Sequence, residues 1–204
     1  MTSSAVAAGS RYDPKTIVVG GIRVGAATGA GVAVFALLSR YLSGTPEALV
    51  QSLIVLLGGA LVTYWPAALV RPRDVDTIGW TCLLGSVGAV AFTIVDIALL
   101  RPLHTYDWTW DAIGGGSGFW YISIWGMGAT FLAWMGAWRY AIAAGRGRAT
   151  GLVALSAQPL VLALALFLAL AVSTGRVRPG YAALTYAIAA IVAVPVAAWS
   201  GTRR

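Results

Sequence analysis

Residues 152–172 read LVALSAQPLVLALALFLALAV, and this stretch decides the fold class. It contains no charged side chain. About 20 helical residues cross the roughly 30 Å hydrocarbon core of a bilayer, and this run is long enough to do so. A strand of a membrane β-barrel would be about 10 residues long and would alternate polar with apolar positions, which this run does not do. The stretch therefore predicts a transmembrane helix.

Apolar runs of similar length lie on both sides of it along the chain. We expect the spans to cover residues 17–42, 48–70, 78–100, 119–144, 152–172 and 181–199. The sequence thus predicts an all-α integral membrane protein, a bundle of about six transmembrane helices that forms a single transmembrane domain over residues 1–204. The connections are short, except for a predicted outer loop at residues 101–118. The chain does not open on a basic region followed by a short apolar run, and the first apolar run is long, so we expect it to be retained as a span and not removed as a signal peptide.

The composition agrees with a lipid-facing surface. Hydrophobic residues make up 59% of the chain and charged residues 10%, whereas soluble proteins carry about 25% charged residues. The formal net charge is +7, but the basic residues stand singly or in pairs between apolar runs. This pattern favours a role in topology and in contact with lipid headgroups. We expect the lipid bilayer as a partner, and no nucleic acid.

The arginines predict the orientation of the bundle. If both termini lie on one side, that inner side receives most of the basic residues: Arg11, Lys15, Arg23, Arg71, Arg73, Arg139, Arg146, Arg148, Arg203 and Arg204. The outer side receives Arg40, Arg101, Arg176 and Arg178. Because basic residues accumulate in cytoplasmic loops, both termini are predicted to be cytoplasmic. We expect a multi-pass protein of the cell membrane, of the bacterial cytoplasmic type.

Small residues recur at a spacing of four in two of the predicted helices. The first row is a glycine zipper at Gly21, Gly25, Gly29 and Ala33, and the second consists of Ala129, Ala133 and Ala137. Spacing of four places each row on one helix face, where another backbone can approach closely. The rows predict helix packing. The partner helix could belong to this bundle or to another subunit.

Large side chains form a stripe on the fourth predicted helix, at Trp120, Met127, Phe131, Trp134 and Trp138. One interpretation is packing and contact with lipid, with the outermost tryptophans at the two membrane boundaries. The alternative is an aromatic face for a flat apolar ligand. No cofactor is predicted, but a bound lipid, carotenoid or quinone would suit such a face.

Charged residues within predicted spans are functional candidates by default, and two qualify here, Arg23 and Asp96. Arg23 lies toward the inner surface and Asp96 near the outer one, so about half the membrane separates them. We therefore predict that Asp96 pairs with Arg40 or Arg101 and not with Arg23. Gln158 lies at a depth similar to that of Arg23 and could bond it. A proton relay needs carboxylates along its path, and no acidic residue is placed at mid-membrane.

Two classes of function remain after this reading. The chain has one histidine and one cysteine and carries no recognisable catalytic or metal-ligand spacing, so we expect it not to be an enzyme. The favoured hypothesis is a non-catalytic accessory or scaffolding subunit of a larger membrane complex, such as an energy-transducing one. The alternative is a small membrane transporter or substrate-binding membrane subunit. That alternative needs polar groups converging on broken helices, for which the prolines at Pro66 and Pro159 are the candidates.

Overall fold

A computed structural model describes residues 13–103, 105 and 126–199, and these residues form helices without strands. The elements are α1 (Pro14–Tyr41), α2 (Gly44–Val70), α3 (Val75–Val95), η1 (Asp96–Leu100), α5 (Gly128–Gly145), α6 (Leu152–Thr174) and α7 (Pro179–Trp199). Five helices are long and apolar enough to cross a membrane: α1, α2, α3 continued by η1, α6 and α7. The all-α membrane bundle predicted from the sequence is confirmed. The 18 described residues of α5 occupy the place of the remaining predicted span.

Local sequence signals set several helix ends. The side chain of Asp13 accepts a hydrogen bond from the backbone N–H of Lys15, and Pro14 occupies the first turn of α1. Asp74 and Thr77 form a reciprocal capping box at the start of α3. Gly175 ends α6 in the left-handed conformation, with φ of 63°. The first two signals begin a helix and the third ends one, each close to a boundary of the apolar run that predicted the helix.

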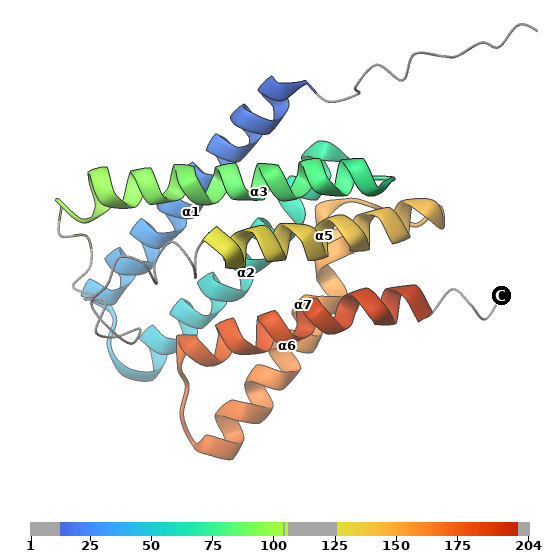
Figure 1. The fold of residues 1–204 in the computed structure, drawn as a ribbon. Coiled ribbons are helices and arrows are strands. Elements are labelled where there is room, and N and C mark those ends of the chain that lie inside the picture. The colour runs from blue at the N-terminus through green and yellow to red at the C-terminus, as the bar shows by residue number, and fades with distance from the viewer. Residues whose placement is uncertain (1–12, 104, 106–125, 200–204) are drawn as a thin grey trace, which may run out of the picture.

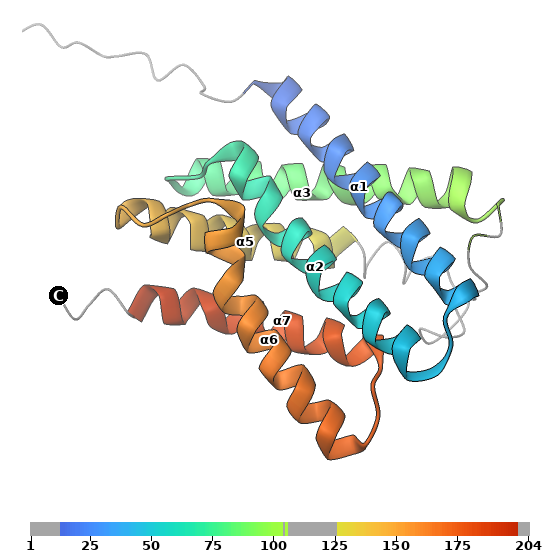
Figure 2. The ribbon, with the colours of Figure 1, turned by 180° about the vertical axis from the view of Figure 1, so that it is seen from behind.

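The helices pack in two layers (Figures 1 and 2). Helices α3, α5 and α7 lie side by side in one layer, and α1, α2 and α6 cross behind them. Helix α2 is the centre of the bundle, because it contacts α1, α3, α5, α6 and α7. The connections α2–α3 and α5–α6 and the C-terminal end of α7 lie at one end, which we call the inner end. The connections α1–α2 and α6–α7 lie at the opposite, outer end.

Glycines stand where the helices approach most closely. A Cβ atom added to Gly25 would lie 2.5 Å from the carbonyl oxygen of Gly88, at the crossing of α1 and α3. One added to Gly136 would overlap the carbonyl oxygen of Thr63 at the crossing of α2 and α5. Real side chains cannot occupy these positions unless the helices separate. The bundle is therefore held by close backbone contact, as expected where lipid leaves little hydrophobic gain from helix association.

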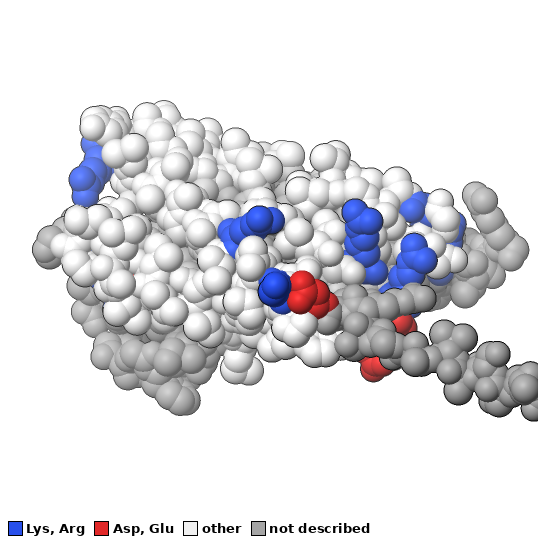
Figure 3. Space-filling model, turned by 90° about the horizontal axis from the view of Figure 1, so that it is seen from above, with Lys and Arg blue, Asp and Glu red and all other residues white. Residues whose placement is uncertain are grey.

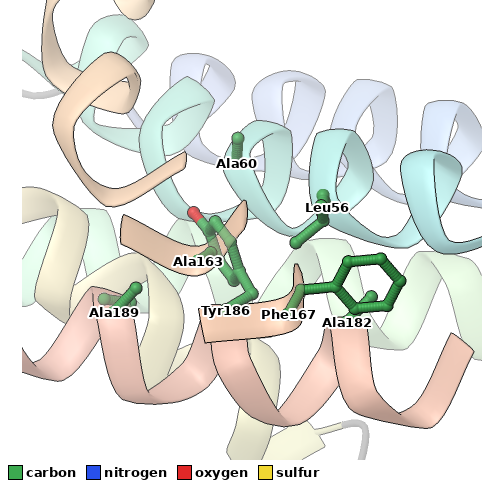
Figure 4. Packing of buried hydrophobic residues seen from close by; sticks show 8 residues of the cluster. Leu56, Ala60, Ala163, Phe167, Ala182, Tyr186 and Ala189 are labelled. Atoms are coloured by element: carbon green, nitrogen blue, oxygen red, sulfur yellow. The ribbon is translucent and has the colours of Figure 1, made fainter. Parts of the chain in front are cut away.

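The largest buried cluster fills the space between α2, α6 and α7 (Figure 4). It consists of Leu56, Ala60, Ala163, Phe167, Ala182, Tyr186, Ala189 and Ala190. The two aromatic rings fit among alanines, which lets three helices meet around them. The hydroxyl of Tyr186 donates a 3.0 Å hydrogen bond to Oγ1 of Thr63, so its polar tip is satisfied inside the bundle.

The outer surface of the bundle is apolar. Large exposed hydrophobic side chains occur on every long helix, for example Leu57 on α2 and Leu164 on α6. On the face drawn in Figure 3, charged side chains are few, and uncharged residues cover most of the described surface. Such a surface would be insoluble in water but is suited to acyl chains.

Candidate functional site

Arg139 is a buried arginine at the inner end whose side chain makes three hydrogen bonds. It lies on α5 with only 7% of its surface exposed. Its Nε donates to the carbonyl oxygen of Leu155 at 2.9 Å, and its Nη1 to that of Ala193 at 3.0 Å. Its Nη2 donates to Oε1 of Gln158 at 2.8 Å. One guanidinium thus ties α5 to both α6 and α7.

Pro159 explains why Arg139 finds an acceptor on α6. In an α-helix the carbonyl of Leu155 would accept from the N–H of the residue four positions later. That residue is Pro159, which has no N–H to donate. The guanidinium of Arg139 supplies the missing donor. Prolines are tolerated in membrane helices when a neighbouring helix satisfies the freed backbone group in this way.

A partly open cavity of about 440 Å³ lies beside this cluster, at the inner ends of α5, α6 and α7. Its polar lining comes from Arg139, Arg148 and Gln158. Apolar side chains form the rest of the wall, among them Ile142 on α5 and Val196 on α7. The cavity therefore joins a cationic rim to an apolar wall.

A second arginine forms hydrogen bonds with the carbonyl groups at the C-terminal end of α7. The Nη2 of Arg146 donates to the carbonyl oxygen of Ala198 at 2.7 Å, and its Nη1 donates to that of Ala197. These carbonyls are among the last four of α7, which have no donor within the helix itself. A cation there also interacts favourably with the negative end of the helix dipole. Arg146 and Arg139 together fasten α7 to the α5–α6 hairpin.

The charge of this part of the chain is uniformly positive. No aspartate or glutamate follows Asp111 in the sequence, whereas seven arginines do: Arg139, Arg146, Arg148, Arg176, Arg178, Arg203 and Arg204. Of these, Arg176 and Arg178 lie at the outer end, in the α6–α7 connection. Helices α5, α6 and α7 thus carry no carboxylate that could neutralise the arginines of the inner end.

The glycine row of the first helix faces α3 inside the bundle. A Cβ atom on Gly21 would lie 2.5 Å from a methyl group of Val87, and one on Gly29 would lie 2.9 Å from Val95. Ala33 packs beside the buried cluster of Phe92 and Leu100. Of the two partners left open by the sequence, the structure places a helix of the same chain against this row.

The alanine row of α5 is also directed inward. Ala133 and Ala137 are fully buried, and Ala129 is partly buried. A Cβ atom on Gly85 would lie 2.5 Å from that of Ala133, so α3 and α5 cross there. Glycine on one helix and alanine on the other make this crossing close.

The aromatic side of α5 points away from the bundle. Phe131, Trp134 and Trp138 are 39%, 41% and 38% exposed. The rings of Phe131 and Trp134 contact each other with centroids 5.9 Å apart. Trp120, the remaining tryptophan of the predicted stripe, lies outside the described residues. We call the exposed side chains of Phe131, Trp134 and Trp138 the aromatic face.

The structure separates the intramembrane polar residues into different environments. Asp96 is fully buried, and its Oδ2 accepts from Nε of Arg101 at 2.9 Å, a pairing predicted from their common depth. Arg23 is exposed on the surface of α1. The expectation that Gln158 bonds Arg23 is wrong, because Gln158 lies on α6 and accepts from Arg139 instead.

No family model, curated protein or solved structure matches this chain. Its function must therefore be inferred from its own residues.

Sequence reasoning assigns Arg139 to topology alone and so misses its structural role. Two of its three partners are backbone carbonyls, which leave no trace in the sequence. A signal is present at Pro159, because any proline inside a helix frees the carbonyl four residues before it. That signal identifies the acceptor, but the packing of α5 against α6 is needed to identify the donor.

Proposed function

We propose that this protein is a non-catalytic accessory or scaffolding subunit of a larger membrane complex, for example an energy-transducing one. The observation that carries this proposal is the aromatic face of α5. The helix buries small residues on one side and presents three aromatic rings on the other, outward side. Aromatic side chains are enriched at protein interfaces because they combine a large apolar area with few rotatable bonds.

The depth of Trp134 supports a protein partner over lipid alone. It lies eleven residues before the end of α5 at Gly145, or about 16 Å along the helix axis, which is within the hydrocarbon core of a bilayer. Acyl chains offer no hydrogen-bond acceptor to an indole N–H. Among the described residues, no hydrogen bond from Trp134 or Trp138 is present. A neighbouring subunit with an acceptor at this depth would satisfy the indole and cover the rings.

The test is photo-crosslinking in the native membrane. A photoreactive residue at position 134 should capture one defined protein in near-stoichiometric yield. The same residue at position 164 is the matched control, because Leu164 is exposed at 47% on α6 and lies away from the aromatic face. Equal crosslinking at both positions, or crosslinking to lipid alone at 134, would contradict the proposal.

A small transporter or substrate-binding membrane subunit is the second candidate. It is supported by the convergence of Arg139 and Gln158 on the proline-broken part of α6, beside a cavity. In this case proteoliposomes containing the protein alone would take up a small anion. The favoured proposal expects no such uptake.

A further inference from the structure

We propose that the cavity at the inner ends of α5, α6 and α7 binds the phosphate headgroup of an anionic phospholipid. The cavity combines two features that such a ligand requires. Arg139, Arg148 and Gln158 supply donors for phosphate oxygens, and Ile142, Leu155 and Val196 supply an apolar wall. Basic pockets between membrane helices are a common site for anionic headgroups.

The geometry of Arg139 leaves donors for a phosphate. A guanidinium has five N–H groups, of which Nη1 and Nη2 carry two each. The hydrogen bonds to Leu155, Ala193 and Gln158 take one N–H from each nitrogen. These bonds fix the plane of the guanidinium at the cavity wall. A fixed planar fork is the arrangement that suits phosphate oxygens.

Charge balance also calls for an anion. At the outer end the buried carboxylate of Asp96 pairs with Arg101, whose side chain is partly exposed. At the inner end lie Arg139 on α5 and Arg146 and Arg148 in the α5–α6 connection, and α5, α6 and α7 contain no acidic residue. A buried cation is costly unless an opposite charge or several dipoles surround it. The three hydrogen bonds of Arg139 go to neutral oxygens, so a phosphodiester in the cavity would supply a counter-charge beside it.

The depth of the cavity favours a lipid over a soluble anion. Arg139 lies six residues before the end of α5, or about 9 Å inward from it. Helix ends project into the headgroup layer, so the guanidinium reaches the level of lipid phosphates and glycerol. The apolar part of the wall then adjoins the acyl chains. A soluble phosphate would use the arginines but would leave that wall empty.

The experiment measures thermal stabilisation and native mass spectra of the full chain in mild detergent. The probes are short-chain phosphatidylglycerol, phosphatidylcholine with the same chains, and inorganic phosphate. We expect phosphatidylglycerol to raise Tm and to remain bound in the gas phase, and the other two to have little effect. The substitution Arg148→Gln should weaken phosphatidylglycerol binding roughly fivefold, since one basic side chain near a headgroup is lost.

Two further variants keep the proposal falsifiable. Ala157 is exposed and lines the cavity, so Ala157→Trp should fill it and abolish the lipid effect without changing any charge. Arg178→Gln removes an exposed arginine at the outer end and should leave binding unchanged. Three outcomes would overturn the proposal: equal stabilisation by phosphatidylcholine, stabilisation by inorganic phosphate but not by phosphatidylglycerol, and equal loss in the Arg148 and Arg178 variants. None of these readouts depends on a partner at the aromatic face.

Discussion

Arg139 and Pro159 act as one structural unit, although 20 positions separate them in the sequence. The proline removes a donor from α6 and the arginine replaces it from α5. Each residue taken alone would be unfavourable inside a membrane helix. Together the guanidinium donor and the freed carbonyl form a hydrogen bond that links α5 to α6.

This unit predicts a coupled effect on stability. Arg139→Met keeps an unbranched side chain but leaves the Leu155 carbonyl and Gln158 without their donor, so we expect a loss of about 1–3 kcal/mol. In a Pro159→Ala background the helix regains an N–H for that carbonyl. In that background Arg139→Met should lower the free energy of unfolding by about 1 kcal/mol less than it does in the native chain. Thermal or denaturant unfolding in detergent measures all four members of the cycle.

The control for this cycle is Arg178→Met, at an exposed position in the α6–α7 connection. Its effect should lie within about 0.5 kcal/mol of zero. Strict additivity of the Arg139 and Pro159 substitutions would show that the arginine does not replace the missing donor.

The residue scale also shows how far depth alone can predict a partner. Asp96 and Arg101 are close in sequence and in depth, so their pairing follows from the sequence. Depth also matches Gln158 to Arg23, but the helix of Gln158 packs on α2 and α7 and its partner comes from α5. Depth fixes one coordinate of a side chain. The lateral order of the helices, which the sequence does not encode in a readable pattern, fixes the other two.

At the scale of the element, the junction of α3 and η1 gives Asp96 its partner. The N–H of Arg101 bonds the carbonyl of Asp96 at 3.0 Å, five residues back and not four. In a regular α-helix, residues five apart differ by about 140° around the axis and point in different directions. The wider turn of a π-helix brings them onto nearly the same side. The ion pair and the π turn therefore depend on each other.

The glycine row of α1 yields a prediction with a control on the same helix. Gly25→Leu should separate α1 from α3 and cost at least about 1–3 kcal/mol, because its side chain would meet the Gly88 carbonyl and Ala91. Gly31 has no atom near its Cβ position, so Gly31→Leu should be nearly neutral. Thermal unfolding of the purified chain compares the two variants.

Comparing the isolated protein with its complex shows whether the glycine row of α1 packs within this chain or against another subunit. Since its contact is with α3, the instability of Gly25→Leu should be present in the isolated protein. A variant that keeps its full stability alone but no longer enters a complex would place another subunit against the row, and would contradict the arrangement described above.

For the whole molecule, the fold class could be read from the sequence because lipid imposes one rule on every span. Each backbone polar group must be satisfied within the bilayer, so a long apolar run has to be a helix. The small-residue rows could be found because spacing of four places residues such as Gly25 and Gly29 on one face. The partners of those rows could not be found, since glycine permits close approach by any helix.

The orientation of the bundle is open to a direct test. We expect a reporter fused at residue 147 to be active in the cytoplasm and one fused at residue 110 to be active outside, because the arginines gather at the inner end. The opposite pair of activities would invert the bundle. It would then place the α5–α6–α7 cavity in the outer leaflet.

The arginines of the α6–α7 connection have a consequence for how the protein enters the membrane. In the predicted orientation, Arg176 and Arg178 must be carried outward against a potential that is negative inside. At 100 mV this electrical work is about 2.3 kcal/mol per charge, or about 4–5 kcal/mol for the pair, and the α6–α7 hairpin contains no acidic residue that would reduce it. The apolar length of α6 and α7 has to supply that work. Collapsing the potential with an uncoupler should therefore speed the appearance of this hairpin on the outside, as measured by protease accessibility. If the uncoupler slowed its appearance instead, the potential would be driving insertion of the hairpin and not opposing it.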